Sequence, residues 1–205
     1  MILTAAYDGR LELRRDTGGA VRLAGRFPYN KRAVLSDGGR TGRPRKEVIA
    51  SRAFRYRVER PDEDIHFLLG HSYDRPLASR GAGTLDISDG DDALTFTAVI
   101  APELQRASYV ADFLAALGAG LILGLSPGFR IPPQRAVPNA ETVEEEDPGE
   151  GTALIRTVHE ALLYEISAVT RPAYKEAEIE ARKWELGNFP SFEPPRLQHL
   201  QRWLL

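Results

Sequence analysis

The sequence places three residue types that support serine chemistry in the order histidine, serine, carboxylate. His71 directly follows an apolar run at 65–69, Ser126 lies in a second apolar run, and Glu165 and His159 lie in a third. A serine hydroxyl is a weak nucleophile near neutral pH, so an imidazole must take its proton during attack. A further group must orient that imidazole and stabilise its cation. We therefore expect Ser126 to be a nucleophile and His71 its base; without the serine, His71 would fit a buried or capping histidine better.

The serine also lies in a string that matches the G-x-S-x-G pattern of the α/β-hydrolase nucleophile elbow, from Gly124 to Gly128. That motif uses the backbone N–H of the residue after the serine as an oxyanion donor, and Pro127 has no N–H. Prolines shortly afterwards also prevent the helix that should follow, and the best-placed histidine is upstream rather than downstream. The sequence thus keeps the serine as a candidate and excludes the hydrolase elbow.

Two residues compete for the orienting position. Glu165 and His159 are six residues apart, and period-2 counting puts them on the same side of what we expect to be one long strand, from 153 to 170. An anionic carboxylate stabilises an imidazolium better than a neutral imidazole, which favours Glu165. The alternatives are an ion pair of Glu165 with Arg156 or Arg171, and a solvent-facing His159.

The elements that must carry these residues are mostly short strands. Apolar alternation and turn residues predict strands near 3–7, 10–14, 20–27, 65–69, 84–87, 94–100 and 121–131, in addition to the run at 153–170. Helical spacing predicts one convincing helix from Leu104 to Leu117, a short helical piece near 47–56, and a charged helix at 173–184. The prediction is a mainly β protein of the α+β class, with an antiparallel or mixed barrel flanked by helices.

Two polar segments are expected to be loops, and the chain is expected to form one domain. We expect a flexible loop at about 28–45 and an acidic loop at about 138–151, because neither has an apolar period. Residues 1–184 form the expected domain, and 185–205 the expected C-terminal tail.

Composition narrows the function classes. The chain has no Cys, which removes thiolate nucleophiles and Cys-based metal sites, and no His/Asp/Glu cluster has metal-ligand spacing, so we expect neither a metal nor a cofactor. No membrane span or signal peptide is evident, so we expect the protein to remain inside the cell.

The charge is unevenly distributed along the chain. Residues 1–60 hold 15 Lys and Arg against 6 Asp and Glu, whereas the remainder holds 12 against 23. The basic part could contact nucleic acid, but it has few aromatic residues for stacking on bases, so we do not expect this. The alternative is that the basic residues are solvated or lie beside the acidic part of the same fold.

Three segments, in order, resemble the tailed-phage prohead maturation proteases and, more remotely, the herpesvirus assemblins. The first is an apolar strand that runs into Gly70-His71-Ser72, followed by Arg75-Pro76-Leu77-Ala78. The second is Leu125-Ser126-Pro127-Gly128-Phe129, and the third is the segment from Tyr164 to Tyr174, YEISAVTRPAY. Together they extend the resemblance from about residue 20 to about residue 180.

This resemblance implies a herpesvirus-assemblin-like seven-stranded β-barrel surrounded by helices. It also implies a serine endopeptidase that acts in the host cytoplasm, inside the immature capsid or prohead, on the major capsid protein or its scaffold segment, and often on itself. The phage signature favours Glu165 as the third member, while the herpesvirus relatives use histidine. Gly128 and Arg171 are the oxyanion candidates, and the analogy also allows a homodimer. The alternative is a noncatalytic capsid assembly factor that binds scaffold.

Overall fold

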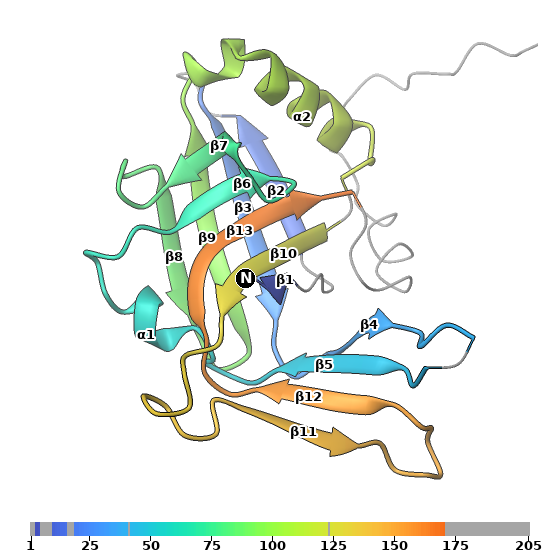
Figure 1. Cartoon of the computed structure of the whole chain (residues 1–205). Coiled ribbons are helices and arrows are strands. Elements are labelled where there is room, and N and C mark those ends of the chain that lie inside the picture. Colours follow the sequence, from blue (N-terminus) through green and yellow to red (C-terminus); the bar gives the residue numbers. More distant parts are fainter. Residues whose placement is uncertain (1–2, 5–9, 16–18, 41, 123, 171–205) are drawn as a thin grey trace, which may run out of the picture.

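The computed structural model describes residues 3–4, 10–15, 19–40, 42–122 and 124–170 (Figure 1). Three sheets and two α-helices make up this part of the chain. Two of the sheets enclose the core and the third projects from them as an arm, at the lower right of Figure 1.

Sheet A carries the candidate site residues and sheet B lies behind it. The strands of sheet A, in spatial order, are β1 (Leu3–Thr4), β10 (Gly124–Arg130), β13 (Leu162–Val169), β6 (His66–Leu69) and β7 (Ser72–Ser79). Those of sheet B are β2 (Arg10–Arg15), β3 (Val21–Pro28), β9 (Ala93–Ile100) and β8 (Leu85–Asp89). The parallel pairing of β13 with β6 makes sheet A a mixed sheet, as the sequence predicted.

The core forms between these two sheets because their strands alternate apolar and polar residues. In β3, positions Val21, Leu23 and Gly25 are buried while the residues between them are exposed. The ring of Phe67 in sheet A lies 5.0 Å from that of Phe96 in sheet B. Period-2 alternation therefore fixes which face of each strand meets the other sheet.

The mainly β prediction is confirmed, but the predicted seven-stranded barrel is not. In the described ranges, the strands group into sheets of five, four and four, and none of these closes on itself. The expected hairpin around Asp89-Gly90-Asp91 is present as β8 and β9.

Within the described residues, α-helices occupy fewer residues than the sequence suggested. A 3₁₀ turn, η1 (Leu104–Arg106), leads into α2 (Ser108–Gly118), which buries Val110 and Phe113 over one end of the sheets. The prediction of a short helix near 47–56 is wrong for its first residues, because Glu47 lies in a strand. The helix found there, α1, spans only Arg55–Val58.

The arm, sheet C, includes two strands, β4 and β11, from the segments that the sequence analysis treated as loops. Its strands, in spatial order, are β11 (Glu141–Glu145), β12 (Leu154–Val158), β5 (Arg45–Ile49) and β4 (Arg32–Ser36). The loop predictions at 28–45 and 138–151 are thus wrong where β4 and β11 lie. These strands lack an apolar period because most of their side chains are exposed on the arm rather than packed in the core.

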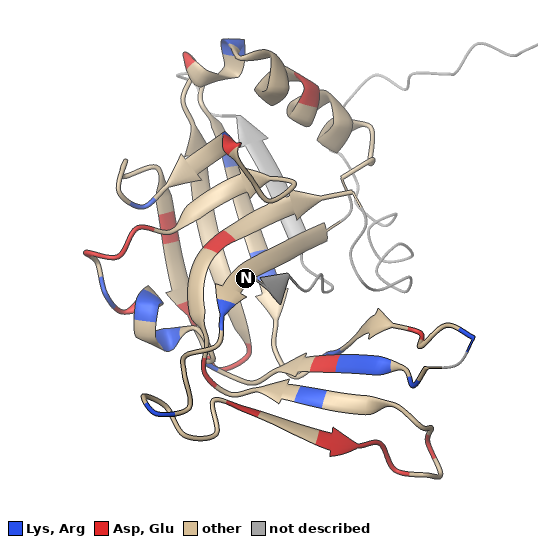
Figure 2. Cartoon of the chain, in the orientation of Figure 1, with Lys and Arg blue, Asp and Glu red and all other residues tan. Residues whose placement is uncertain are grey.

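Ion pairs across the arm explain how polar strands stay together. Glu146, which is 5% exposed, accepts hydrogen bonds from Lys46 and from the backbone N–H of Ala153. Arg156 in β12 bridges Glu47 at 3.1 Å and Glu141 at 2.6 Å. Figure 2 shows basic residues on the inner strands of the arm and acidic ones on β11. Within the arm, acidic residues of the second part of the chain lie beside basic residues of the first.

Candidate active site

His71 lies in the tight turn that joins β6 to β7. Leu69 pairs with Ser72, so Gly70 and His71 are the two central residues, with φ of 61° and 60°. Positive φ at both positions is what a type I′ hairpin turn requires. Glycine adopts this conformation freely, but histidine does so only at a cost, of about 1–2 kcal/mol, that surrounding contacts must offset. Backbone hydrogen bonds from β13 supply these contacts: the N–H of Gly70 donates to the carbonyl of Ala168 at 3.0 Å.

The imidazole of His71 meets the carboxylate of Glu165. Its Nδ1 lies 2.7 Å from Oε1 of Glu165, which is 1% exposed in the middle of β13. An ionised carboxylate can only accept a hydrogen bond, so this contact places a proton on Nδ1 and leaves Nε2 as the acceptor. The pair can therefore act as a base oriented by an anion.

Ser167 connects both members of this pair, and the sequence analysis did not identify it. Its hydroxyl donates to Oε2 of Glu165 at 2.6 Å, and its oxygen accepts from the backbone N–H of His71 at 2.9 Å. The side chain is fully buried. One residue thus holds the carboxylate and the left-handed backbone of His71. Period-2 counting from Glu165 would have indicated it, since residues two apart on a strand share a face.

Gly128 lies directly beneath the carboxylate. In the ladder of β10 and β13, Gly128 pairs with Glu165, and a Cβ at this position would lie 1.9 Å from Oε1 of Glu165. Any larger residue would push the carboxylate away from His71. The structure therefore gives this glycine a role as the floor of the site, in addition to the oxyanion role expected from the sequence.

Ser126 occupies the neighbouring position on the same face. It pairs with Ser167 in the same ladder, two residues before Gly128, so strand alternation brings it to the side on which Glu165 lies. Ser126 is 2% exposed, whereas 29% of the His71 side chain is exposed. The imidazole is therefore the part of this group that solvent reaches.

His159 lies elsewhere. The expected long strand from 153 to 170 is instead two strands in different sheets, because the chain turns between Val158 and Leu162. His159 is exposed in that turn, where its Nε2 lies 3.1 Å from the hydroxyl of Thr142 in the arm. The expectation that His159 shares a strand face with Glu165 is therefore wrong. The side chain that contacts the His71 ring is that of Glu165. The other alternative for Glu165, an ion pair with Arg156, is also not found, because Arg156 binds Glu47 and Glu141.

The remaining expectations concern Arg171, the C-terminal segment, metal binding and membrane spans. Arg171, the helix at 173–184 and the tail at 185–205 lie outside the described residues. Among the residues that the structure describes, no group of three or more His, Asp and Glu side chains could hold a metal ion. None of the described helices is long and apolar enough to cross a membrane.

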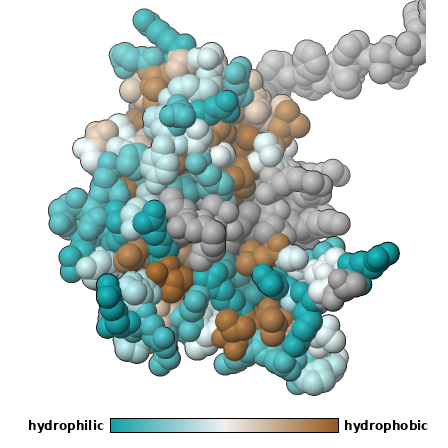
Figure 3. Space-filling view, viewed as in Figure 1, coloured by the Kyte–Doolittle hydropathy of each residue, from teal (hydrophilic) through white to brown (hydrophobic). Residues whose placement is uncertain are grey.

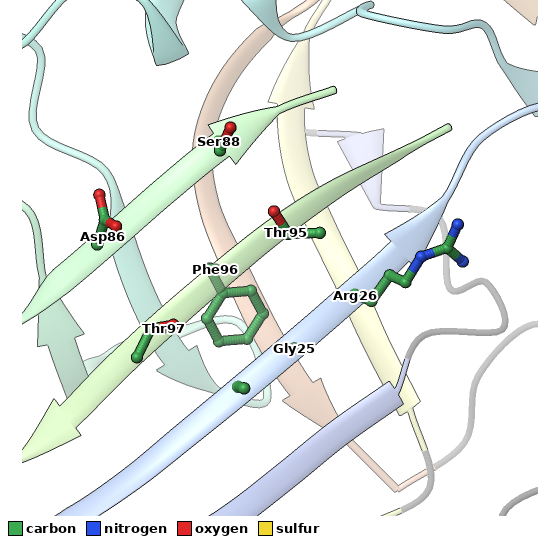
Figure 4. Close-up of a pocket in the computed structure, with 8 residues that line it drawn as sticks. Gly25, Arg26, Asp86, Ser88, Thr95, Phe96 and Thr97 are labelled. Carbon is green, nitrogen blue, oxygen red and sulfur yellow. The ribbon is translucent and has the colours of Figure 1, made fainter. Parts of the chain in front are cut away.

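An open hollow lies on sheet B. Figure 4 shows it on the outer face of sheet B, where alternate side chains of β3, β8 and β9 point to solvent. Its lining residues are Ala24, Gly25, Arg26, Asp86, Ser88, Thr95, Phe96 and Thr97. The site residues lie on sheet A, and none of them lines this hollow.

Comparison with known protein families matches residues 35–191 to the family described as caudovirus prohead serine protease. The chain belongs to this family. The match spans both the His71 turn and the Glu165 strand, and it confirms the resemblance seen in the sequence. A search of the curated proteins and a search of the solved structures each found no match to this prohead serine protease.

Proposed function

We propose that this prohead serine protease is an endopeptidase whose catalytic residues are Ser126, His71 and Glu165. The contact between Nδ1 of His71 and the buried carboxylate of Glu165, at 2.7 Å, carries this proposal. An imidazole held in one tautomer by a buried anion is the arrangement that a serine nucleophile needs. Ser126 lies in the segment that resembles the family's serine segment, and it is in the strand next to Glu165 on the same face.

The reaction follows from these roles. Nε2 of His71 takes the proton of the Ser126 hydroxyl as the oxygen attacks the peptide carbonyl, and Glu165 stabilises the imidazolium that forms. The imidazolium then gives this proton to the leaving amine when the C–N bond breaks, which leaves an acyl ester on Ser126. Water, deprotonated by His71, hydrolyses the ester and regenerates the serine.

The tetrahedral intermediate needs hydrogen-bond donors for its oxyanion. Pro127 has no N–H, so the backbone N–H of Gly128 and the segment at Arg171 are the donors that we propose. Gly128 pairs with Thr4 in β1 and with Glu165 in β13. Its N–H can bind the oxyanion only if it does not donate a hydrogen bond to either of these strands.

We further propose that the substrate is the capsid protein or a scaffold segment inside the prohead, that the enzyme cleaves itself, and that it can form a homodimer. The assemblin-like barrel belongs to the same proposal, and it requires sheets A and B to pair at their edges. The family membership supports the choice of substrate.

Co-expression with the cognate capsid or scaffold protein tests the function. The wild-type chain should shorten the precursor to a defined product, and Ser126→Ala and His71→Ala should each leave it intact while remaining folded. Equal processing by wild type and Ser126→Ala would contradict the assignment. Precursor binding without cleavage by the wild type would favour the alternative, a noncatalytic assembly factor.

A further inference from the structure

A cluster of aromatic and basic side chains lies beside the Glu165 carboxylate. The guanidinium carbons of Arg57 and Arg130 lie 4.3 Å and 5.2 Å from the centroid of the Tyr164 ring. Tyr164 is the extra residue of a β-bulge in β13, since Gly128 pairs with Glu165 and Phe129 with Leu163. A bulge re-aims a side chain, and here it presents the ring next to Glu165.

Tyr73 extends this cluster toward solvent. Its ring, in β7, lies 5.5 Å from that of His66 in an edge-on arrangement, and the residue is 50% exposed. Burial raises the pKa of Tyr73, the negative charge of Glu165 raises it further, and the charges of Arg57 and Arg130 lower it. The charges of Glu165, Arg57 and Arg130 therefore all act on Tyr73.

Among the described residues of this region, most charged side chains form ion pairs and Arg130 forms none. Arg57 forms an ion pair with Glu63 at 2.9 Å, and Asp64 lies 3.5 Å from Nε2 of His66. Glu165 is taken by His71. Arg130 is exposed, and within the described part of the chain its guanidinium contacts the Tyr164 ring but no carboxylate. An exposed guanidinium held over an aromatic ring, with no carboxylate partner among the described residues, is well placed to bind a carboxylate from another molecule.

Arg130 also lies in the same strand as Ser126. It is four residues after Ser126 in β10, a distance of about 13 Å along a strand at roughly 3.3 Å per residue. Ser126, Gly128 and Arg130 alternate onto one face of β10. An extended substrate with its scissile bond at Ser126 therefore brings a residue roughly three to five positions away to Arg130.

We infer that Arg130, supported by Tyr164, Arg57 and Tyr73, forms a substrate subsite for an acidic side chain, three to five residues from the scissile bond. This inference rests on the proposed function. Arg130 supplies the charge, Tyr164 holds it, and Arg57 is already compensated by Glu63, so the subsite selects one carboxylate rather than a run of them.

Digestion of a proteome-derived peptide library by the full chain tests this inference. Ser126→Ala supplies the background, and Arg26→Glu, at an exposed position on the far sheet, is the matched charge control. The wild type and Arg26→Glu should both enrich Asp and Glu at one position in this range. Arg130→Glu should lose the enrichment and favour Lys or Arg there. For a matched pair of Glu and Gln peptides, Arg130→Gln should lower kcat/KM for the Glu peptide by roughly ten-fold, and change that of the Gln peptide little.

The outcomes separate the two proposals. Ser126-dependent cleavage without acidic enrichment, or with enrichment that survives in Arg130→Glu, would overturn the subsite and leave the protease assignment standing. An absence of Ser126-dependent cleavage would overturn the protease assignment and the subsite with it.

Discussion

Replacing Gly128 by alanine adds one methyl group beneath the Glu165 carboxylate. That methyl would lie 1.9 Å from Oε1 and 2.6 Å from Cδ of Glu165. Ordinary contact needs about 3.4 Å or more, so the carboxylate must move by about 1.5 Å, and its 2.7 Å contact with Nδ1 of His71 breaks. Misplacing a catalytic group by this distance costs roughly 10²-fold, and losing the orienting anion of a triad about 10⁴-fold. We therefore predict a fall in kcat of roughly 10²- to 10⁴-fold, with KM changed little.

A time course of precursor processing, with matched amounts of folded enzyme, measures this effect. Gly118→Ala is the matched control, because no atom lies within 4 Å of the Cβ that it would add at the end of α2. The control should process at the wild-type rate. If Gly128→Ala cleaves the precursor at a rate within about three-fold of wild type, the position of the Glu165 carboxylate does not depend on Gly128. The proposed link between this geometry and the rate is then incorrect.

Two further substitutions test the supports of the fold and site. Ser167→Ala removes the donor to Oε2 of Glu165 and leaves the buried N–H of His71 without its acceptor, so we expect unfolding to become easier by about 2–4 kcal/mol in urea. Processing should also slow in kcat rather than KM, and an unchanged kcat would make Ser167 merely structural. Burial raises the pKa of Asp89, which accepts the hydrogen bond of Tyr29, so the contribution of this carboxyl to stability is complete below about pH 4 and is lost as pH rises through its raised pKa. Asp89→Asn keeps an acceptor for Tyr29 and does not ionise. The melting temperature of this variant, relative to that of the wild type, should therefore rise between pH 4 and pH 7. A difference in melting temperature that does not depend on pH would contradict this.

The sequence was sufficient wherever one local rule decided the structure. The alternation in 20–27 and 94–100 predicted β3 and β9, and the apolar run at 65–69 predicted the strand that delivers His71. The prediction that Glu165 rather than His159 meets His71 used a charge argument and the family signature, and the structure agrees on the contact. Each of these features depends on residues close together in the chain or on one chemical argument.

The sequence was insufficient where pairing between segments far apart in the chain determines the structure. The strands β4 and β11 have no apolar period because ion pairs, such as those of Arg156, hold the arm together in place of a core. The break at His159 followed from β12 joining β5 in the arm, which nothing local to 153–170 reveals. The role of Gly128 beneath Glu165 likewise depends on a register between two strands that are far apart in sequence.

Covalent labelling with a fluorophosphonate, read out by mass spectrometry of the digested protein, tests the central claim most directly. We predict one modified residue, Ser126, in the wild-type chain, with labelling slowed by roughly 10²-fold or more in Glu165→Gln and abolished in His71→Ala. Modification of another serine, or labelling of Ser126 at the same rate in His71→Ala and wild type, would contradict the claim that His71 and Glu165 activate Ser126.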